Sequence, residues 1–337
     1  MSETSRADLV LYIFNACGIR ADVVIAPAII PMMLFKSIEN FIIYIVLFRI
    51  ILKQGIRMNS KVNDIRIDIQ KLKKLPTLSY TAEKILNLTS KELTHLDELV
   101  SIIERDPPIM SKVLGVANIV YLGVYKPITT IKDALLKIGF KTLRNIALGI
   151  AIFSLFKSSP EKEKTYARLF KHSIATGSIA QIIADKFLEE TSDENFTAGV
   201  LHDIGLFALY YAFNNHFKKI EETVSEEITL IKAEEEIIGT NHAQVGKWLA
   251  EMWGLPEVVQ EVILYHHDFP DKSLKYAKQV ALVQLSNYIA EKLDYYPLGK
   301  KSETEFHKER VYKILNLPQP EELIFELKEM VKDIEDL

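Results

Sequence analysis

A histidine and an aspartate stand side by side at His202 and Asp203, just after a short apolar stretch. An imidazole nitrogen and a carboxylate oxygen are both good ligands for divalent transition metals. Of the 8 histidines in the chain, four more lie within the same stretch of sequence: His172, His242, His266 and His267. Any one of them alone is best interpreted as an ordinary core or surface histidine. Five histidines and one carboxylate together favour a metal site.

Distant histidines can meet only if the fold brings their segments together, and the pattern of the chain predicts an all-α fold. Long helical periodicities dominate, and no alternating segment bounded by turn residues stands out as a strand. Apolar residues make up 48% of the 337 residues and charged residues 26%, as in a folded globular protein. The net charge of −4 argues against a nucleic-acid-binding surface.

Residues 1–57 form an apolar N-terminal extension that differs from the rest of the chain. Its two apolar runs, 23–35 and 41–48, are each shorter than the ~20 residues that a membrane-spanning helix needs. Three interpretations remain: a membrane-touching segment over residues 23–52, an extra helical pair, or a start that lies too early. The polar stretch that begins at Met58 favours the last, with translation beginning there.

Residues 58–292 are predicted to be one domain of two helical halves. In the first half, 58–157, Thr81 is expected to cap a helix through Leu88, and Asp106 begins another helix. Thr130 caps a further helix that Gly139 ends.

The second half, 160–292, carries the candidate ligands. A long helix over 161–189 contains His172, and Asn241 or Thr240 caps the helix that begins near His242. The amphipathic segment 228–238 is expected to have three solvated acidic residues: Glu234, Glu235 and Glu236. Residues 293–337 form a C-terminal helical extension. Its apolar stripe packs on the protein's own body or, alternatively, makes a dimer or partner contact.

Several short motifs follow one another between about Leu72 and Asn287. They are Lys74–Leu75–Pro76–Thr77–Leu78, Ile103–Glu104–Arg105–Asp106–Pro107, Val113 to Asn118, Thr130 to Leu135 with Ile138–Gly139, His242 to Gly246, and Trp253–Gly254–Leu255–Pro256. In this order they resemble the HDOD domain, the HD-related output domain of bacterial signalling proteins. This domain belongs to the superfamily of HD-type metal-dependent phosphohydrolases. The resemblance implies an all-helical fold in which an N-terminal half packs on an HD-like half.

The resemblance also implies a ligand set. His172 matches the first HD histidine, and His202 with Asp203 matches the signature pair. His242 and the tandem His266–His267 match the extra ligands of the two-metal branch, and Asn287 stands where catalytic relatives have an aspartate. The implied cofactor is one or two divalent transition metal ions such as Fe or Mn, with Asp203 as the bridging and, in an active enzyme, catalytic carboxylate.

Four positions depart from the catalytic pattern. Asn287 replaces the last aspartate, Leu206 replaces a lysine that contacts phosphate, and Arg168 replaces a glutamate of a three-metal variant. The segment after His267, Asp268–Phe269–Pro270, keeps an acid but lacks the Gly-Tyr-Pro loop of cyclic dinucleotide phosphodiesterases. These changes argue against hydrolysis of cyclic di-GMP in particular.

The leading hypothesis is a cytoplasmic signal-transduction module that binds metal and relays state through a signalling protein or a small nucleotide ligand. Its single cysteine, Cys17, fits a reducing compartment. The rival is a metal-dependent hydrolase of a nucleotide or cyclic dinucleotide. A third class, a membrane-tethered adaptor, rests on residues 23–52 alone. A homodimer is a further option, and His95, His216 and His307 are interpreted as ordinary surface or packing residues.

Overall fold

The computed structural model of the chain describes residues 76–88, 93–121, 127–156, 163–188, 194–225, 227–269, 273–301, 307–317, 320–332 and 334. Contacts along the chain divide it into two units, Met1–Asp64 and Ile65–Leu337. All described residues belong to the second unit. The predicted N-terminal extension, the proposed start at Met58 and the motif residues Lys74 and Leu75 therefore lie outside them.

The described residues form helices and no strand, which confirms the predicted all-α fold. The first half contains α5 (Tyr80–Asn87), α6 (Leu93–Glu104), α7 (Pro107–Val120) and α8 (Ile131–Ser154). The second contains α9 (Glu163–Ile183), the π-helical turn η3 (Ala184–Leu188), α10 (Asn195–Leu201), α11 (Ile204–Ala212), α12 (Asn214–Thr223), α13 (Leu230–Ile238), α14 (His242–Met252), α15 (Glu257–Tyr265) and α16 (Ala277–Lys292). Helices α17 (Lys308–Leu315) and α18 (Pro320–Met330) follow.

Polar side chains fix where several helices begin. Thr130 caps α8 as predicted, and α7 starts at the predicted place, with Asp106 as its cap. Each side chain accepts a hydrogen bond from a backbone N–H of the first turn. The predicted cap at Thr81 is wrong, because the Ser79 hydroxyl accepts from the backbone N–H of Ala82 at 3.1 Å and α5 begins at Tyr80. Gly139 has a φ of 77° and bends α8 at the predicted point.

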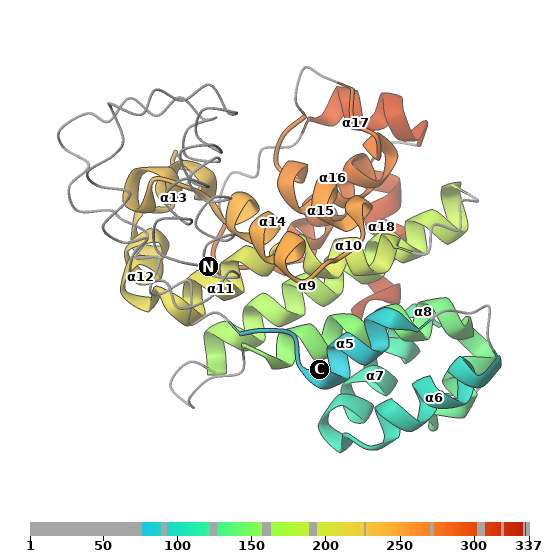
Figure 1. Cartoon of the computed structure of the whole chain (residues 1–337). Helices are drawn as coiled ribbons and strands as arrows, with labels where there is room; N and C mark the ends of the chain where they lie inside the picture. Colours follow the sequence, from blue (N-terminus) through green and yellow to red (C-terminus); the bar gives the residue numbers. More distant parts are fainter. Residues whose placement is uncertain are drawn as a thin grey trace, which may run out of the picture. The chain divides into compact units, whose positions relative to one another are not determined.

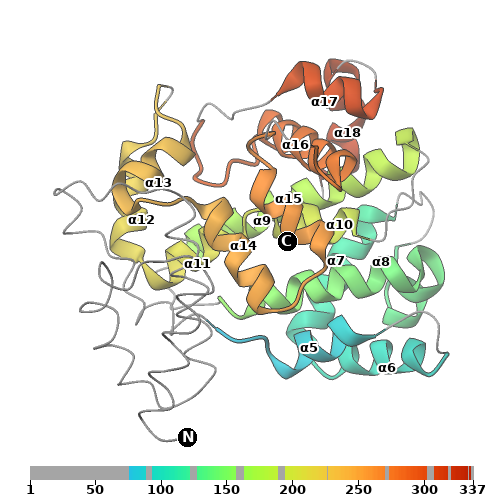
Figure 2. The ribbon, with the colours of Figure 1, turned by 45° about the horizontal axis from the view of Figure 1, so that its top comes forward.

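Helix α9 is the central helix of the described unit, and nearly every residue from Leu169 to Ile183 is buried. It packs against α10 and α16, and it also contacts α7 from the first half. Figures 1 and 2 show α5 to α8 gathered on one side of α9, with α14, α15 and α16 on another. The two helical halves therefore share one core, and His172 is buried on the helix that both contact.

Glycines allow the closest helix contacts. A Cβ on Gly177 of α9 would overlap the Val200 side chain, and a Cβ on Gly199 of α10 would lie 2.8 Å from the Gly177 Cα. A Cβ on Gly205 of α11 would overlap the carbonyl oxygen of His242, where α14 begins. Because no side chain separates these backbones, the helices approach closely and the candidate ligands that they carry lie close to one another.

The C-terminal helix packs on its own unit, as the first of the two sequence interpretations predicted. Leu323, Leu327, Val331 and Ile334 are buried. The Tyr295 hydroxyl donates a hydrogen bond to the Val331 carbonyl oxygen at 3.1 Å.

Among the described helices, no single one is both long enough and apolar enough to cross a membrane. In the part of the chain that the structure describes, one helix pair, Asn195–Ala212 with Asn214–Thr223, reaches that length and composition, and it is bent by 119°.

Candidate metal centre

Four separate segments deliver the predicted ligands. His172 lies within α9, and His202 with Asp203 forms the turn between α10 and α11. His242 is the first residue of α14, because Asn241 caps that helix by accepting from the backbone N–H of Gln244 at 3.0 Å. His266 and His267 directly follow α15. The fold brings all six side chains together.

One group of ligand atoms comes from α9 and the turn after α10. The Nε2 atoms of His172 and His202 lie 3.3 Å apart, and each lies 3.3 Å from Asp203 Oδ2. These three atoms could hold one metal ion.

A second group lies on the other side of the same carboxylate. Asp203 Oδ1 is 3.2 Å from His242 Nε2 and 3.3 Å from His266 Nε2. His242 Nε2 is in turn 3.2 Å from His266 Nε2 and 3.0 Å from His267 Nε2. These four atoms could hold another ion, and Asp203 would bridge the two, with one oxygen on each.

The outer ring nitrogens of four histidines are already engaged. His172 Nδ1 lies 2.6 Å from the Tyr295 carbonyl oxygen, His202 Nδ1 lies 2.7 Å from that of Gly199, and His266 Nδ1 lies 2.7 Å from that of Ile263. His242 Nδ1 lies 2.7 Å from Glu234 Oε2. Each of these oxygens accepts a hydrogen bond, so Nδ1 carries the hydrogen. When Nε2 carries no proton, it presents its lone pair to the centre.

This arrangement fits a metal ion chemically. Neutral imidazole nitrogens that face one another and a carboxylate have no hydrogen atoms to share between them, so a cation or added protons must balance their lone pairs. Two ligands about 2.1 Å from an ion stand about 3.0–3.4 Å apart, which matches the observed distances. The donor set of imidazole and carboxylate suits Fe, Mn and Zn alike.

The charges of the centre follow from burial and from these contacts. In the metal-free centre, added protons lie between the facing nitrogens and the carboxylate. Burial raises the pKa of Asp203 there, but the charge of His202 and hydrogen bonds from His172, His202 and His242 outweigh it, so that the pKa lies well below its usual value. Burial together with the charge of His202 and His242 lowers the pKa of His266 to about 4. The centre therefore combines an ionised carboxylate with a neutral His266.

The model of the HDOD domain family matches residues 75–269, more than half of the chain. The chain belongs to the HDOD family. A curated relative, an uncharacterised protein of Treponema pallidum (strain Nichols), is 22% identical to this HDOD protein over 253 residues. That match covers 73% of this chain and 48% of the relative, so the chain spans about half the length of the curated relative that it matches.

Solved structures share the fold. An HDOD domain protein of unknown function from Geobacter sulfurreducens is 26% identical with a TM-score of 0.62, covering 78% of this chain and 91% of that one. A candidate phosphohydrolase from Shewanella amazonensis SB2B is 21% identical with a TM-score of 0.57, covering 79% and 97%. A candidate signal transduction protein from Marinobacter aquaeolei VT8 is 22% identical with a TM-score of 0.61, covering 82% and 62%.

Three residues of this HDOD domain differ from the catalytic pattern, and the structure shows the surroundings of each. Leu206 is fully buried in the core. Arg168 forms an ion pair with Glu221, with 2.9 Å between Nη2 and Oε1. Asn287 lies on α16, which packs against α9, and its buried Oδ1 has no hydrogen-bond partner among the described residues. An unpartnered amide oxygen is compatible with a ligand role, which for Asn287 stays a prediction.

Glu234 corrects the prediction that all three acidic residues of α13 are solvated. Its side chain is fully buried, and Oε2 accepts hydrogen bonds from both the backbone N–H and Nδ1–H of His242, at 2.9 Å and 2.7 Å. The sequence did contain a signal. Glu234 falls in the helical stripe of Leu230, Ala233 and Ile238, all of which are buried.

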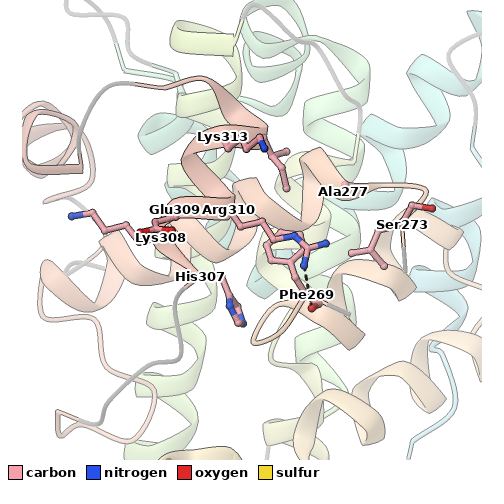
Figure 3. A pocket seen from close by; sticks show the side chains of 10 residues that line it. Phe269, Ser273, Ala277, His307, Lys308, Glu309, Arg310 and Lys313 are labelled. Carbon is pink, nitrogen blue, oxygen red and sulfur yellow. Dashed lines mark hydrogen bonds between the residues drawn. The ribbon is translucent and has the colours of Figure 1, made fainter. Parts of the chain in front are cut away.

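A pocket of about 960 Å³ opens next to the segment that carries the last ligands. Its lining begins at Phe269, two residues after His267, and includes the positively charged side chains of Lys308, Arg310 and Lys313. Figure 3 shows Arg310 lying across Phe269, where Nη1 donates to the Phe269 carbonyl oxygen at 3.3 Å. The neighbouring His307 Nε2 lies 3.3 Å from Asp268 Oδ1.

Proposed function

We propose that this HDOD protein is a signal-transduction module that holds two divalent transition metal ions. The occupancy of the ion positions would change the arrangement of the helices, and this change would carry the signal. The shared carboxylate carries this proposal. Asp203 offers one oxygen to each of two groups of inward-facing imidazoles, and backbone or carboxylate acceptors hold four of those rings. Histidine side chains that bind no common ion would not need to be held with their Nε2 atoms facing one another.

A regulatory role is favoured over turnover by access and by charge. Asp203 is 3% exposed, and His172, His202, His242 and His266 are at most 1% exposed. At the two positions where catalytic relatives carry a lysine and an aspartate, this chain has Leu206 and Asn287. A buried centre with fewer charges suits ions that tie helices together better than ions that receive a large substrate.

Ions bound at this centre would connect four segments of the fold. The ligands come from α9, from the turn between α10 and α11, from the start of α14 and from the end of α15. Ions that bind all four segments stabilise one arrangement of them, and a change in occupancy shifts that arrangement. The name of the similar Marinobacter protein, which refers to signal transduction, agrees with this role.

We propose the pocket beside Phe269 as the binding place of a small anionic ligand, in keeping with the expected nucleotide. Lys308, Arg310 and Lys313 supply positive charge and outnumber the one acidic lining residue, Glu309. Leu274, Ala277 and Ile314 supply apolar surface. Binding of nucleoside mono- and diphosphates to Lys313→Glu is expected to fall about tenfold or more relative to wild type. Lys164→Glu, at an exposed position of α9, is the matched control. Equal binding by both variants contradicts this location.

A metal-dependent phosphohydrolase is the second candidate function. Two ions bridged by a carboxylate would supply the positive charge that stabilises a transferring phosphoryl group. The bridging position of Asp203 and the name of the similar Shewanella protein favour this alternative. This chain's own part would be to orient the ligands and to keep Asp203 ionised.

One experiment separates the two functions. Purified full-length protein is analysed for bound metal and is then supplied with Mn or Fe and a panel of nucleotide phosphodiesters and phosphomonoesters. Metal-loaded protein that hydrolyses none of them supports the regulatory function. Hydrolysis that disappears in Asp203→Ala supports the enzyme. Protein that contains no metal as purified and binds none when Mn or Fe is supplied contradicts both proposed functions.

A cytoplasmic location is proposed as well, because the single Cys17 cannot form an internal disulfide. The membrane-tethered adaptor depends on residues 23–52, which the structure does not describe, and it stays a prediction. Cell fractionation with an antibody to the domain tests both, since a protein found wholly with membranes contradicts the cytoplasmic location.

A further inference from the structure

Glu234 is a buried carboxylate on the apolar face of α13. Its side chain has no exposed surface, and its neighbours on that face include Leu230, Ala233 and Ile238. An ionised carboxylate in such a place is costly unless a specific partner stabilises it. A residue of this kind is therefore expected to have a defined partner and a defined task.

The partner is His242. Glu234 Oε2 accepts from the Nδ1–H and from the backbone N–H of that residue, while Oε1 is buried without a hydrogen-bond partner among the described residues. The link therefore fixes both the start of α14 and the orientation of one imidazole ring. The opposite ring nitrogen, Nε2, faces Asp203, His266 and His267.

Among the four ligand histidines whose Nδ1 contacts an oxygen, His242 alone has a carboxylate as the acceptor. His172, His202 and His266 donate to the carbonyl oxygens of Tyr295, Gly199 and Ile263. Glu291 adds negative charge near His172, but the hydrogen bond that orients the His172 ring runs to the Tyr295 carbonyl. A carboxylate that accepts the outer ring hydrogen makes the inner nitrogen a stronger metal ligand than a carbonyl does.

We infer that Glu234 is a positioning residue that makes the two ion positions unequal. The position formed by Asp203 Oδ1, His242, His266 and His267 has four ligand atoms and the support of Glu234, so it fills first and binds tightly. The position formed by His172, His202 and Asp203 Oδ2 has three imidazole or carboxylate atoms and fills second. This inference rests on the proposed two-ion function and adds the order of filling and the residue that sets it.

Titration of the metal-free, full-length protein with Mn²⁺, followed by calorimetry, tests the inference. Wild type is expected to bind in a tight and a weaker step. Glu234→Gln keeps the size of the side chain and removes its charge, so it should weaken the tight step about 10- to 100-fold and leave the weaker step unchanged. Glu236→Gln, at an exposed position of the same helix, is the control and should behave as wild type.

The outcomes are distinct. Both steps unchanged in Glu234→Gln, or both weakened equally, overturns the inference, since an equal loss reports a general structural effect. Wild type that binds no Mn²⁺ instead contradicts the proposed function itself. Should Glu234→Gln fail to fold, Glu234→Asp takes its place, because it withdraws the carboxylate from His242 and must weaken the tight step alone.

The order of filling also has a test that does not involve Glu234. His172→Ala removes a ligand of the second position only, so it should keep the tight step and lose the weaker one. His267→Ala should lose the tight step. The reverse pattern overturns the order of filling.

Discussion

Asp203 is the residue that both groups of ligand atoms share, since Oδ2 faces His172 and His202 while Oδ1 faces His242 and His266. Its carboxylate stays ionised because the surrounding imidazoles hold its pKa well below the usual value, despite burial. Replacement of this one side chain should therefore affect both ion positions, whereas replacement of one histidine should affect one.

The prediction at this position concerns metal content. Asp203→Asn keeps the shape of the side chain but removes the charge, so we expect it to lose both ions, while His172→Ala retains one. Mass spectrometry of metals in purified protein, expressed as ions per chain, checks this. Full metal content in Asp203→Asn contradicts the bridging role.

Proton competition gives a second prediction at the scale of residues. Burial lowers the pKa of His242, but the charge of Glu234 and the contact with Asp203 outweigh it and raise the pKa to about 10. The metal-free centre therefore holds a proton on His242 at neutral pH, and an ion must displace it. Metal affinity should rise from about pH 6 to about pH 8, with protons released on binding. Calorimetry in buffers of different ionisation enthalpy measures the release. An affinity that falls over this range contradicts the prediction.

At the scale of elements, the sequence predicted much of what positions the centre. The caps Asp106, Thr130 and Asn241 and the bend at Gly139 are visible in the sequence because each has a local chemical signature. The cap of α5 was misplaced because Ser79 and Thr81 are both hydroxyl residues within one turn. Backbone acceptors such as the Tyr295 carbonyl have no signature in sequence, since every residue type carries the same group.

Ligand geometry also depends on a helix contact that the sequence does not reveal. An added Cβ at Gly205 would overlap the His242 carbonyl oxygen and lie 2.8 Å from the Gly246 backbone nitrogen. We expect Gly205→Ala to push the start of α14 away from Asp203, to cost about 1–3 kcal/mol of stability and to lose the ion held by His242. Thermal unfolding and metal analysis check both effects.

Gly149→Ala is the control for this change. Its added Cβ would meet only the Val200 side chain, at 2.9 Å for the nearest atom, and no ligand backbone. Metal content should stay at the wild-type level in this variant. Loss of metal in Gly149→Ala, or its retention in Gly205→Ala, would show that the contact between α11 and α14 does not set the ligand geometry.

At the scale of the whole described unit, metal and fold stability are linked. The ligands join segments between His172 and His267, and an ion that binds only the folded arrangement stabilises it by mass action. Free ion at about 100 times Kd should add about 2.7 kcal/mol to the free energy of unfolding. Chelation should therefore lower Tm, and added Mn²⁺ should restore it.

Circular dichroism across the melting transition measures this shift. The helix content below the transition is expected to be the same with and without metal, because a large apolar core surrounds α9 independently of the ions. A Tm that does not respond to chelation in protein shown to contain metal contradicts a link between the ions and the fold.

His267 differs from the other five histidine and aspartate ligands in that it is half-buried, while they are buried. His267 is therefore the most exposed of the candidate ligand side chains. An ion held by His172, His202 and Asp203 would have only buried ligands around it, so we expect the two ions to exchange at unequal rates. The ion with only buried ligands should be the slower to leave, even though it is the weaker bound at equilibrium. Residence time and affinity would then rank the two ions in opposite order.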